Sequence, residues 1–82
     1  MLSITKEQAK KLRSKLLHLT VIQQNKKDYG FQLMHESGTL YVLRMKDNPV
    51  PLTCTQLDTA NNIAKFLGFD RWSVRLLEQA MA

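Results

Sequence analysis

The sequence contains only one cysteine, Cys54, which excludes an internal disulfide and any zinc cluster built from several cysteines. No apolar run approaches the ~18 residues that a membrane span requires. Residues 1–15 become charged at once and show no apolar segment of a secretory signal. With three glycines and two prolines, the chain also has no Gly/Ser-rich linker. We therefore expect one domain over residues 1–82, located in the cytoplasm and without a membrane partner.

The motifs of common enzymes are absent as well. The sequence has no Gly-rich phosphate loop, no His-x-x-x-His pair and no nucleophile elbow. Cys54 with His18 or His35 could act as a nucleophile and base, but nothing in their spacing brings them together. Neither histidine has other metal-ligating residues near it. We predict a binding protein that is not an enzyme, with no catalytic residue, metal or cofactor.

Positive charge is concentrated in the first third of the chain. The whole sequence has 12 Lys and Arg against 7 Asp and Glu, a net charge of +5. Residues 1–28 contain seven of these cations and two of the acids, whereas residues 29–82 contain five of each. A polyanionic partner should therefore meet the N-terminal third first, because a local cluster sets the field that a ligand feels. The alternative is that the lysines only solvate a helix.

Hydrophobic spacing predicts a first helix over residues 5–19. Thr5 and Gln8 have the form of a capping box, in which each side chain bonds the other residue's backbone N–H. Leucines and an alanine then recur at helical spacing and form one apolar stripe. Lysines and an arginine flank both edges of that stripe, so we expect basic rims that face outward.

The rest of the chain predicts three strands followed by two helices. The strands cover residues 20–22, 29–33 and 40–45, with a hairpin loop at residues 35–38. The first of these helices covers residues 55–67, with a second capping box at its start and Gly68 at its end. The second covers residues 71–81. The order α-β-β-β-α-α predicts an α+β fold: a three-stranded antiparallel meander with helices packed on one face.

The segment from Ile63 to Leu77 resembles a helix-turn-helix. Ala64, Gly68 and Val74 occupy its small-residue, turn and packing positions. The resemblance implies a recognition helix that presents four side chains to DNA: Arg71, Trp72, Arg75 and Leu76. Two of these are large and apolar, and residues 56–82 have no net charge. Since nonspecific affinity comes mostly from phosphate contacts, we favour a structural helical hairpin.

The element order is also similar to that of double-stranded-RNA-binding domains. That family relies on a lysine cluster at the start of its second helix. Here residues 55–58 are Thr-Gln-Leu-Asp, without a basic residue. The similarity is therefore one of topology alone.

Our main hypothesis is contact with nucleic acid or a nucleoprotein complex through the basic N-terminal third. Tyr29 and Tyr41 could stack on bases if they are exposed. The candidate contact residues are Lys6, Lys10, Lys11, Arg13, Lys15, Lys26, Lys27, Arg71 and Arg75.

The alternative hypothesis is a protein-interaction module: an adaptor or inhibitor of a larger complex, of the kind that phages and other mobile elements carry. Aromatic residues and arginine dominate the energetics of such interfaces. The same apolar surface could instead form a homodimer. The candidate partner-binding residues are Phe66, Phe69, Trp72 and Leu76.

Overall fold

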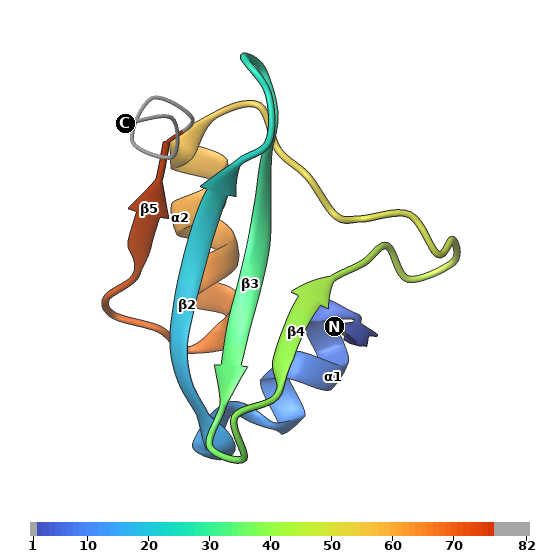
Figure 1. Cartoon of the computed structure of the whole chain (residues 1–82), viewed down its shortest axis with the longest axis vertical. Coiled ribbons are helices and arrows are strands. Elements are labelled where there is room, and N and C mark those ends of the chain that lie inside the picture. The colour runs from blue at the N-terminus through green and yellow to red at the C-terminus, as the bar shows by residue number, and fades with distance from the viewer. Residues whose placement is uncertain (1, 77–82) are drawn as a thin grey trace.

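The computed structural model describes residues 2–76, which form one sheet with helices on one side (Figure 1). Thr5 and Gln8 form the expected capping box at the start of the first helix. The elements, in chain order, are β1 (Leu2–Ile4), α1 (Lys6–Lys11), the 3-10 helix η1 (Arg13–Lys15), β2 (Leu16–Gln23), β3 (Tyr29–His35), β4 (Leu40–Leu43), α2 (Leu57–Leu67) and β5 (Ser73–Arg75).

The sheet is mixed and has five strands in the order β1-β4-β3-β2-β5. Strand β3 pairs antiparallel with both neighbours, while β1 pairs parallel with β4 and β5 pairs parallel with β2. The predicted order α-β-β-β-α-α and the three-stranded meander are therefore wrong. The antiparallel strands form only the centre of the sheet, and a short parallel strand extends it at each edge. The topology of double-stranded-RNA-binding domains is not reproduced either.

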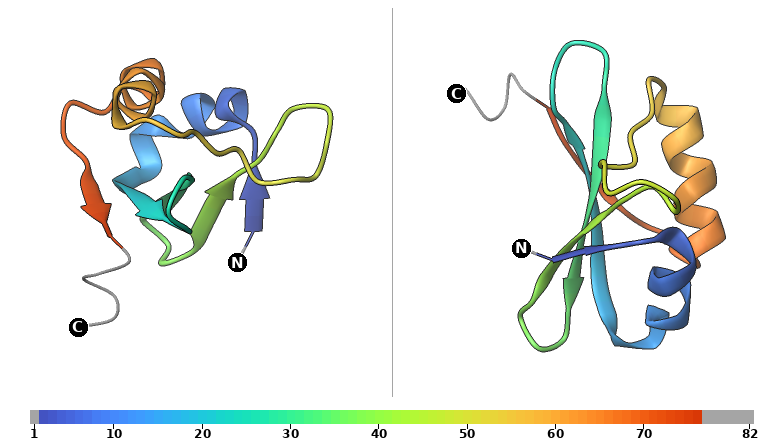
Figure 2. Two further views of the ribbon diagram at one scale, coloured as in Figure 1. Left: turned by 90° about the horizontal axis from the view of Figure 1, so that it is seen from above. Right: turned by 90° about the vertical axis from the view of Figure 1, so that its right-hand side faces the viewer.

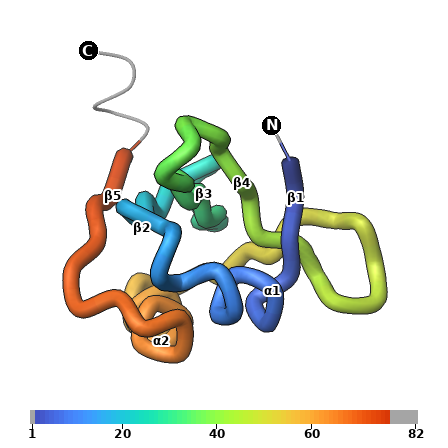
Figure 3. The backbone as a smooth tube through the Cα atoms, turned by 90° about the horizontal axis from the view of Figure 1, so that it is seen from below, coloured from blue at the N-terminus to red at the C-terminus, as the bar shows by residue number. Residues whose placement is uncertain are grey.

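Both helices cover the same face of the sheet (Figure 2). Helix α1 connects β1 to β2, and α2 connects β4 to β5, so each connection crosses two intervening strands. Because both connections join parallel strands and run in the same direction across the sheet, a common handedness puts both helices on one side. Seen from below, α1 and α2 are neighbours, with β1 and β5 at opposite edges (Figure 3).

The first predicted helix ends much earlier than residue 19. Helix α1 stops at Lys11, η1 follows, and residues 16–23 form the longest strand. Leu19 and Val21 alternate with outward residues and are fully buried between the sheet and the helices. Pairing of β2 with strands on both sides outweighs the helical preference of its leucines.

The last predicted helix, over residues 71–81, is also wrong where the structure describes it. Residues 73–75 form β5, paired in register with Thr20–Ile22 of β2. The helix-turn-helix resemblance and the helical hairpin lose their second helix here. The remainder of that prediction, residues 77–81, lies outside the described residues.

The core lies between the sheet and the two helices. Leu19, Leu33, Leu43 and Leu67 are its largest fully enclosed side chains. Helix α2 begins at Leu57 without a side-chain cap, so the second predicted capping box is wrong. It ends as expected at Gly68, whose φ of +93° is left-handed. Among the described residues, no helix is long and apolar enough to cross a membrane.

Candidate nucleic-acid interface

Helix α1 is anchored at its start, which fixes the positions of its lysines. The Thr5 hydroxyl accepts a hydrogen bond from the Gln8 backbone N–H at 3.2 Å, and the Gln8 side chain accepts one from the Thr5 N–H at 2.9 Å. Ala9 is completely buried against the core. Because α1 is held by its cap and by this inner face, Lys6 and Lys10, one turn apart, are presented together.

The two lysines meet an aromatic ring of α2. The Lys10 Nζ lies 4.6 Å from the centroid of the Phe66 ring, and the Lys6 Nζ lies 5.3 Å from it. One turn further along the chain, the Arg13 guanidinium lies 3.8 Å from the Phe69 ring centroid. We call Lys6, Lys10, Arg13, Phe66 and Phe69 the cation–aromatic cluster. It places three cations along the line where α1 and η1 face α2.

Arg13 differs from the two lysines because two of its donors bond backbone carbonyls of the protein. Its Nε donates to the Gly68 carbonyl at 3.1 Å, and its Nη1 donates to the Leu16 carbonyl at 3.0 Å. The guanidinium therefore joins η1, the start of β2 and the end of α2. Its positive charge adds to that of the cluster, while its two hydrogen bonds stabilise the fold.

The other predicted cations separate into distinct groups. Lys11 and Lys15 are exposed on α1 and η1, and Lys11 borders a hollow that Gln8, Leu12 and Tyr41 also line. Lys26 and Lys27 lie in the loop between β2 and β3, at the opposite end of the molecule from α1 (Figure 1). The Asn25 side chain orders this loop: its Oδ1 accepts hydrogen bonds from the backbone N–H groups of Lys27 and Asp28 at 2.8 and 2.9 Å. The lysines of the N-terminal third thus form two surfaces.

Arg71 and Arg75 flank and belong to the edge strand β5, respectively. Arg71 precedes β5, and Arg75 is paired with Ile22 at the edge of the sheet. Val74 packs against the core, so strand alternation directs Arg75 to the face that the helices leave uncovered. Arg75 therefore points away from the cation–aromatic cluster, whereas Arg71 follows Phe69, a member of the cluster, by two residues.

The predicted partner-binding residues do not gather into one exposed patch. Phe69 is only 4% exposed, and Trp72 is half-buried with its Nε1 donating to Asn61 Oδ1 at 3.3 Å. Leu76 is half-buried at the end of the described residues. Phe66 stands apart, with 42% of its surface exposed. Tyr29 and Tyr41, the candidate stacking residues, are half-buried against the core.

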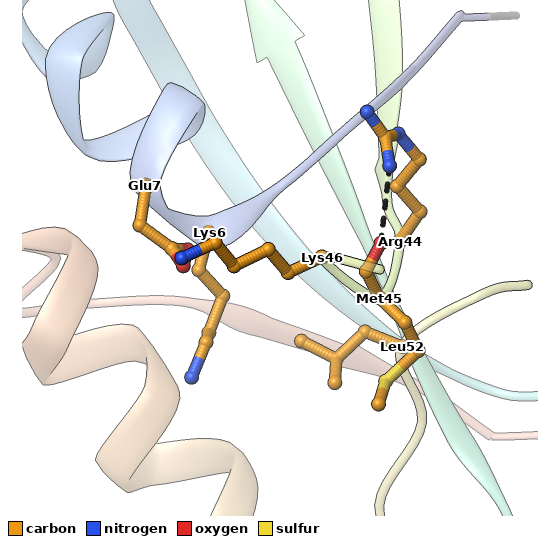
Figure 4. Close-up of a pocket in the computed structure, with 6 residues that line it drawn as sticks. All are labelled: Lys6, Glu7, Arg44, Met45, Lys46 and Leu52. Atoms are coloured by element: carbon orange, nitrogen blue, oxygen red, sulfur yellow. Dashed lines mark hydrogen bonds between the residues drawn. The ribbon is translucent and has the colours of Figure 1, made fainter. Parts of the chain in front are cut away.

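A small pocket of about 200 Å³ adjoins α1, between its first turn and the chain after β4. It brings in two cations that sequence reasoning missed, Arg44 and Lys46. Figure 4 shows that these cations do not converge: Lys46 extends towards Glu7, Lys6 points towards α2, and the Arg44 guanidinium turns back to donate to the Met45 carbonyl at 3.1 Å. The pocket therefore widens the basic surface without forming a closed anion site.

The residues considered for catalysis remain apart from the cluster. Cys54 is buried where its backbone pairs with Tyr29, and burial raises the pKa of its thiol. His18 Nε2 contacts the Ser73 hydroxyl at 2.8 Å, and His35 Nδ1 accepts from the Ser37 N–H at 3.0 Å in the hairpin loop. Within residues 2–76, no three acidic, histidine or cysteine side chains are grouped as metal ligands.

Comparison of the chain with protein-family models and with curated proteins found no match.

Proposed function

We propose that this protein binds nucleic acid, or a nucleoprotein complex, in the cytoplasm through the cation–aromatic cluster, and that it is not an enzyme. One observation supports this most strongly. Two ammonium groups, Lys6 and Lys10, lie within 5.3 Å of the centroid of one exposed ring, that of Phe66. Two positive charges gathered at one ring repel each other, and a polyanion that contacts both relieves the repulsion.

The sequence around these lysines strengthens the electrostatic argument. Residues 6–15 contain five cations and a single carboxylate, that of Glu7. Lys11 and Lys15 are exposed on the same short segment and extend the field beyond Lys6 and Lys10. A regularly spaced polyanion can satisfy several such cations at once, whereas a single small anion cannot. Phosphate contacts of this kind provide sequence-independent affinity.

The test is a pair of charge reversals at the two ends of the molecule. Lys6→Glu/Lys10→Glu removes the lysines of the cluster, and Lys26→Glu/Lys27→Glu makes the same change of charge in the distant loop. Fluorescence anisotropy with labelled DNA and RNA should show affinity that falls steeply with salt. The first variant should lose at least about tenfold in affinity at low salt, and its log–log salt slope should fall by about two.

The loop variant serves as the matched control, because both variants have the same net charge. We expect it to lose less affinity than Lys6→Glu/Lys10→Glu at low salt and to bind like the unchanged protein at physiological salt. Circular dichroism should show both variants folded, since the four lysines are outside the buried core. Equal losses in the two variants would place the binding surface elsewhere. An absence of binding to DNA and RNA at low salt would refute the proposal.

A further inference from the structure

We propose that the Phe66 ring is a stacking platform for an unpaired base, which makes single-stranded nucleic acid the preferred ligand of the cation–aromatic cluster. This inference rests on the proposed function. It is carried by the position of Phe66, which has 42% of its surface exposed, and by the two ammonium groups over its ring.

Phe66 is not required by the core. Helix α2 buries Ala60, Ala64 and Leu67 against the sheet, and Phe66 belongs neither to this core nor to the partly buried side chains that pack around it. Among the described residues it is the most exposed phenylalanine, tyrosine or tryptophan, since the others are buried or half-buried. A rigid aromatic ring on a helix surface beside cations is the combination that single-strand binding sites use.

The two lysines provide a way to uncover the ring. Each ammonium group is carried on a flexible four-carbon stem. In the free protein it is attracted by the negative electrostatic potential of the ring face. A phosphate offers the same ammonium group a full negative charge, so the lysines can turn from the ring to the backbone of the ligand. The exchange pairs both charges and leaves the ring face open to a base.

This mechanism distinguishes single strands from duplexes. The bases of a duplex are stacked and paired inside the helix, so their faces are closed to a ring on the protein surface. In a single strand the bases can turn outwards and stack on an aromatic side chain. The lysines act on both ligands, whereas Phe66 acts only on the single strand.

The experiment compares four labelled probes of about twelve nucleotides each: oligo(dT), oligo(U), a DNA duplex, and a DNA strand of abasic sites. The abasic strand has the phosphates without the bases. The unchanged protein should bind the oligo(dT) or oligo(U) strand at least about tenfold more tightly than the abasic strand, as expected for one stacked base. The dT and U probes show whether the ligand is DNA or RNA.

The decisive variant is Phe66→Leu, which keeps an apolar side chain next to the lysines. It should lose the preference for strands with bases and keep its affinity for the abasic strand. Phe66→Tyr, which keeps a ring, should retain the preference, and Leu57→Ala, at another exposed apolar position on α2, should behave like the unchanged protein. Thermal unfolding should confirm that each variant is folded.

Each outcome has a separate meaning. Equal binding of oligo(dT), oligo(U) and abasic strands, tighter binding of the duplex, or a preference that survives Phe66→Leu would overturn the stacking role. In these cases the backbone contacts of the proposed function remain. If none of the four probes binds at low salt, the proposed function itself fails.

Discussion

At the scale of single residues, Arg13 makes the most contacts of any cation in the cluster. Its guanidinium group bonds two carbonyls and lies 3.8 Å from the centroid of the buried Phe69 ring. Arg13→Ala should lower the free energy of unfolding by about 2 kcal/mol, because charge-assisted hydrogen bonds and a cation–π contact are lost together. Urea denaturation measures this change.

Arg13→Lys is the informative companion variant. Lysine keeps the charge but lacks the planar fork that reaches both the Gly68 and the Leu16 carbonyls. We expect it to recover less than half of the loss. Full recovery would mean that charge alone, without the two directed bonds, stabilises this junction.

Cys54 gives the folded protein a dependence on alkaline pH. Burial raises the pKa of its thiol above the ordinary value of 9.0; the Asp28 carboxylate adds to this rise, and the Gln56 backbone opposes it. Above pH 9 the unfolded chain therefore releases this proton more readily than the folded chain does. The resulting contribution to stability is complete below that pH and decreases as the pH rises through the folded pKa.

The measurement compares urea denaturation of the unchanged protein and Cys54→Ala between neutral pH and about pH 10.5, near the ordinary lysine pKa. The cost of the substitution should become smaller as the pH rises, because the variant lacks the thiol. Lysine titration affects both proteins and cancels in the difference. A cost that is constant with pH would show that the thiol has the same pKa in both states.

At the scale of elements, the sequence predicts what local signals determine. Thr5 and Gln8 mark the start of α1, and Gly68 marks the end of α2, because each position acts through bonds or backbone angles within one turn. Gly38, with φ +90°, likewise closes the expected loop after His35. These features need no knowledge of the rest of the chain.

Elements whose formation depends on a distant partner were predicted wrongly. Leu16 and Leu19 fit a helical stripe, yet Leu19 and Val21 also fit the alternation of a strand, and pairing with β3 and β5 decides between the two. Trp72 and Val74 present the same ambiguity near the end of the described chain. They alternate with exposed Ser73 and Arg75, and this alternation indicates a strand. The prediction of a helix over residues 71–81 did not take it into account.

The assignment of β5 to the sheet edge predicts different costs for its two faces. Val74 packs on the core opposite Val21, so Val74→Ala should lower the free energy of unfolding by about 1 kcal/mol. The neighbouring Arg75 is exposed, and Arg75→Ala should change the free energy of unfolding by less than about 0.5 kcal/mol. Urea denaturation of both variants tests the alternation. Similar costs at both positions would contradict it.

At the scale of the whole molecule, the candidate site was predictable only in part. The excess of cations in the first third of the sequence indicates a basic surface, and α1 does present Lys6 and Lys10 together. Their meeting with Phe66 depends on how α1 packs beside α2, for which the sequence has no local signal. The separation of Lys26 and Lys27 depends on the length of β2, which was underestimated.

That separation predicts how salt should act on binding kinetics. The molecule measures 32 Å along its longest axis, whereas the Debye length is about 8 Å at physiological ionic strength. Lys26→Glu/Lys27→Glu should therefore slow association with a labelled oligonucleotide at low salt, where the whole field steers the ligand. At physiological salt the rates of this variant and the unchanged protein should converge. Stopped-flow fluorescence measures both, and a difference that persists would indicate direct contact by the loop.

The two margins of the sheet have a consequence for the behaviour of the protein at high concentration. Strands β1 and β5 each contain three residues, so either margin offers few free backbone groups to an incoming chain. Long, flat outer strands are the usual templates for fibril growth, and short ones resist it. We therefore expect the short strands that complete the fold to disfavour polymerisation of the native protein through its sheet.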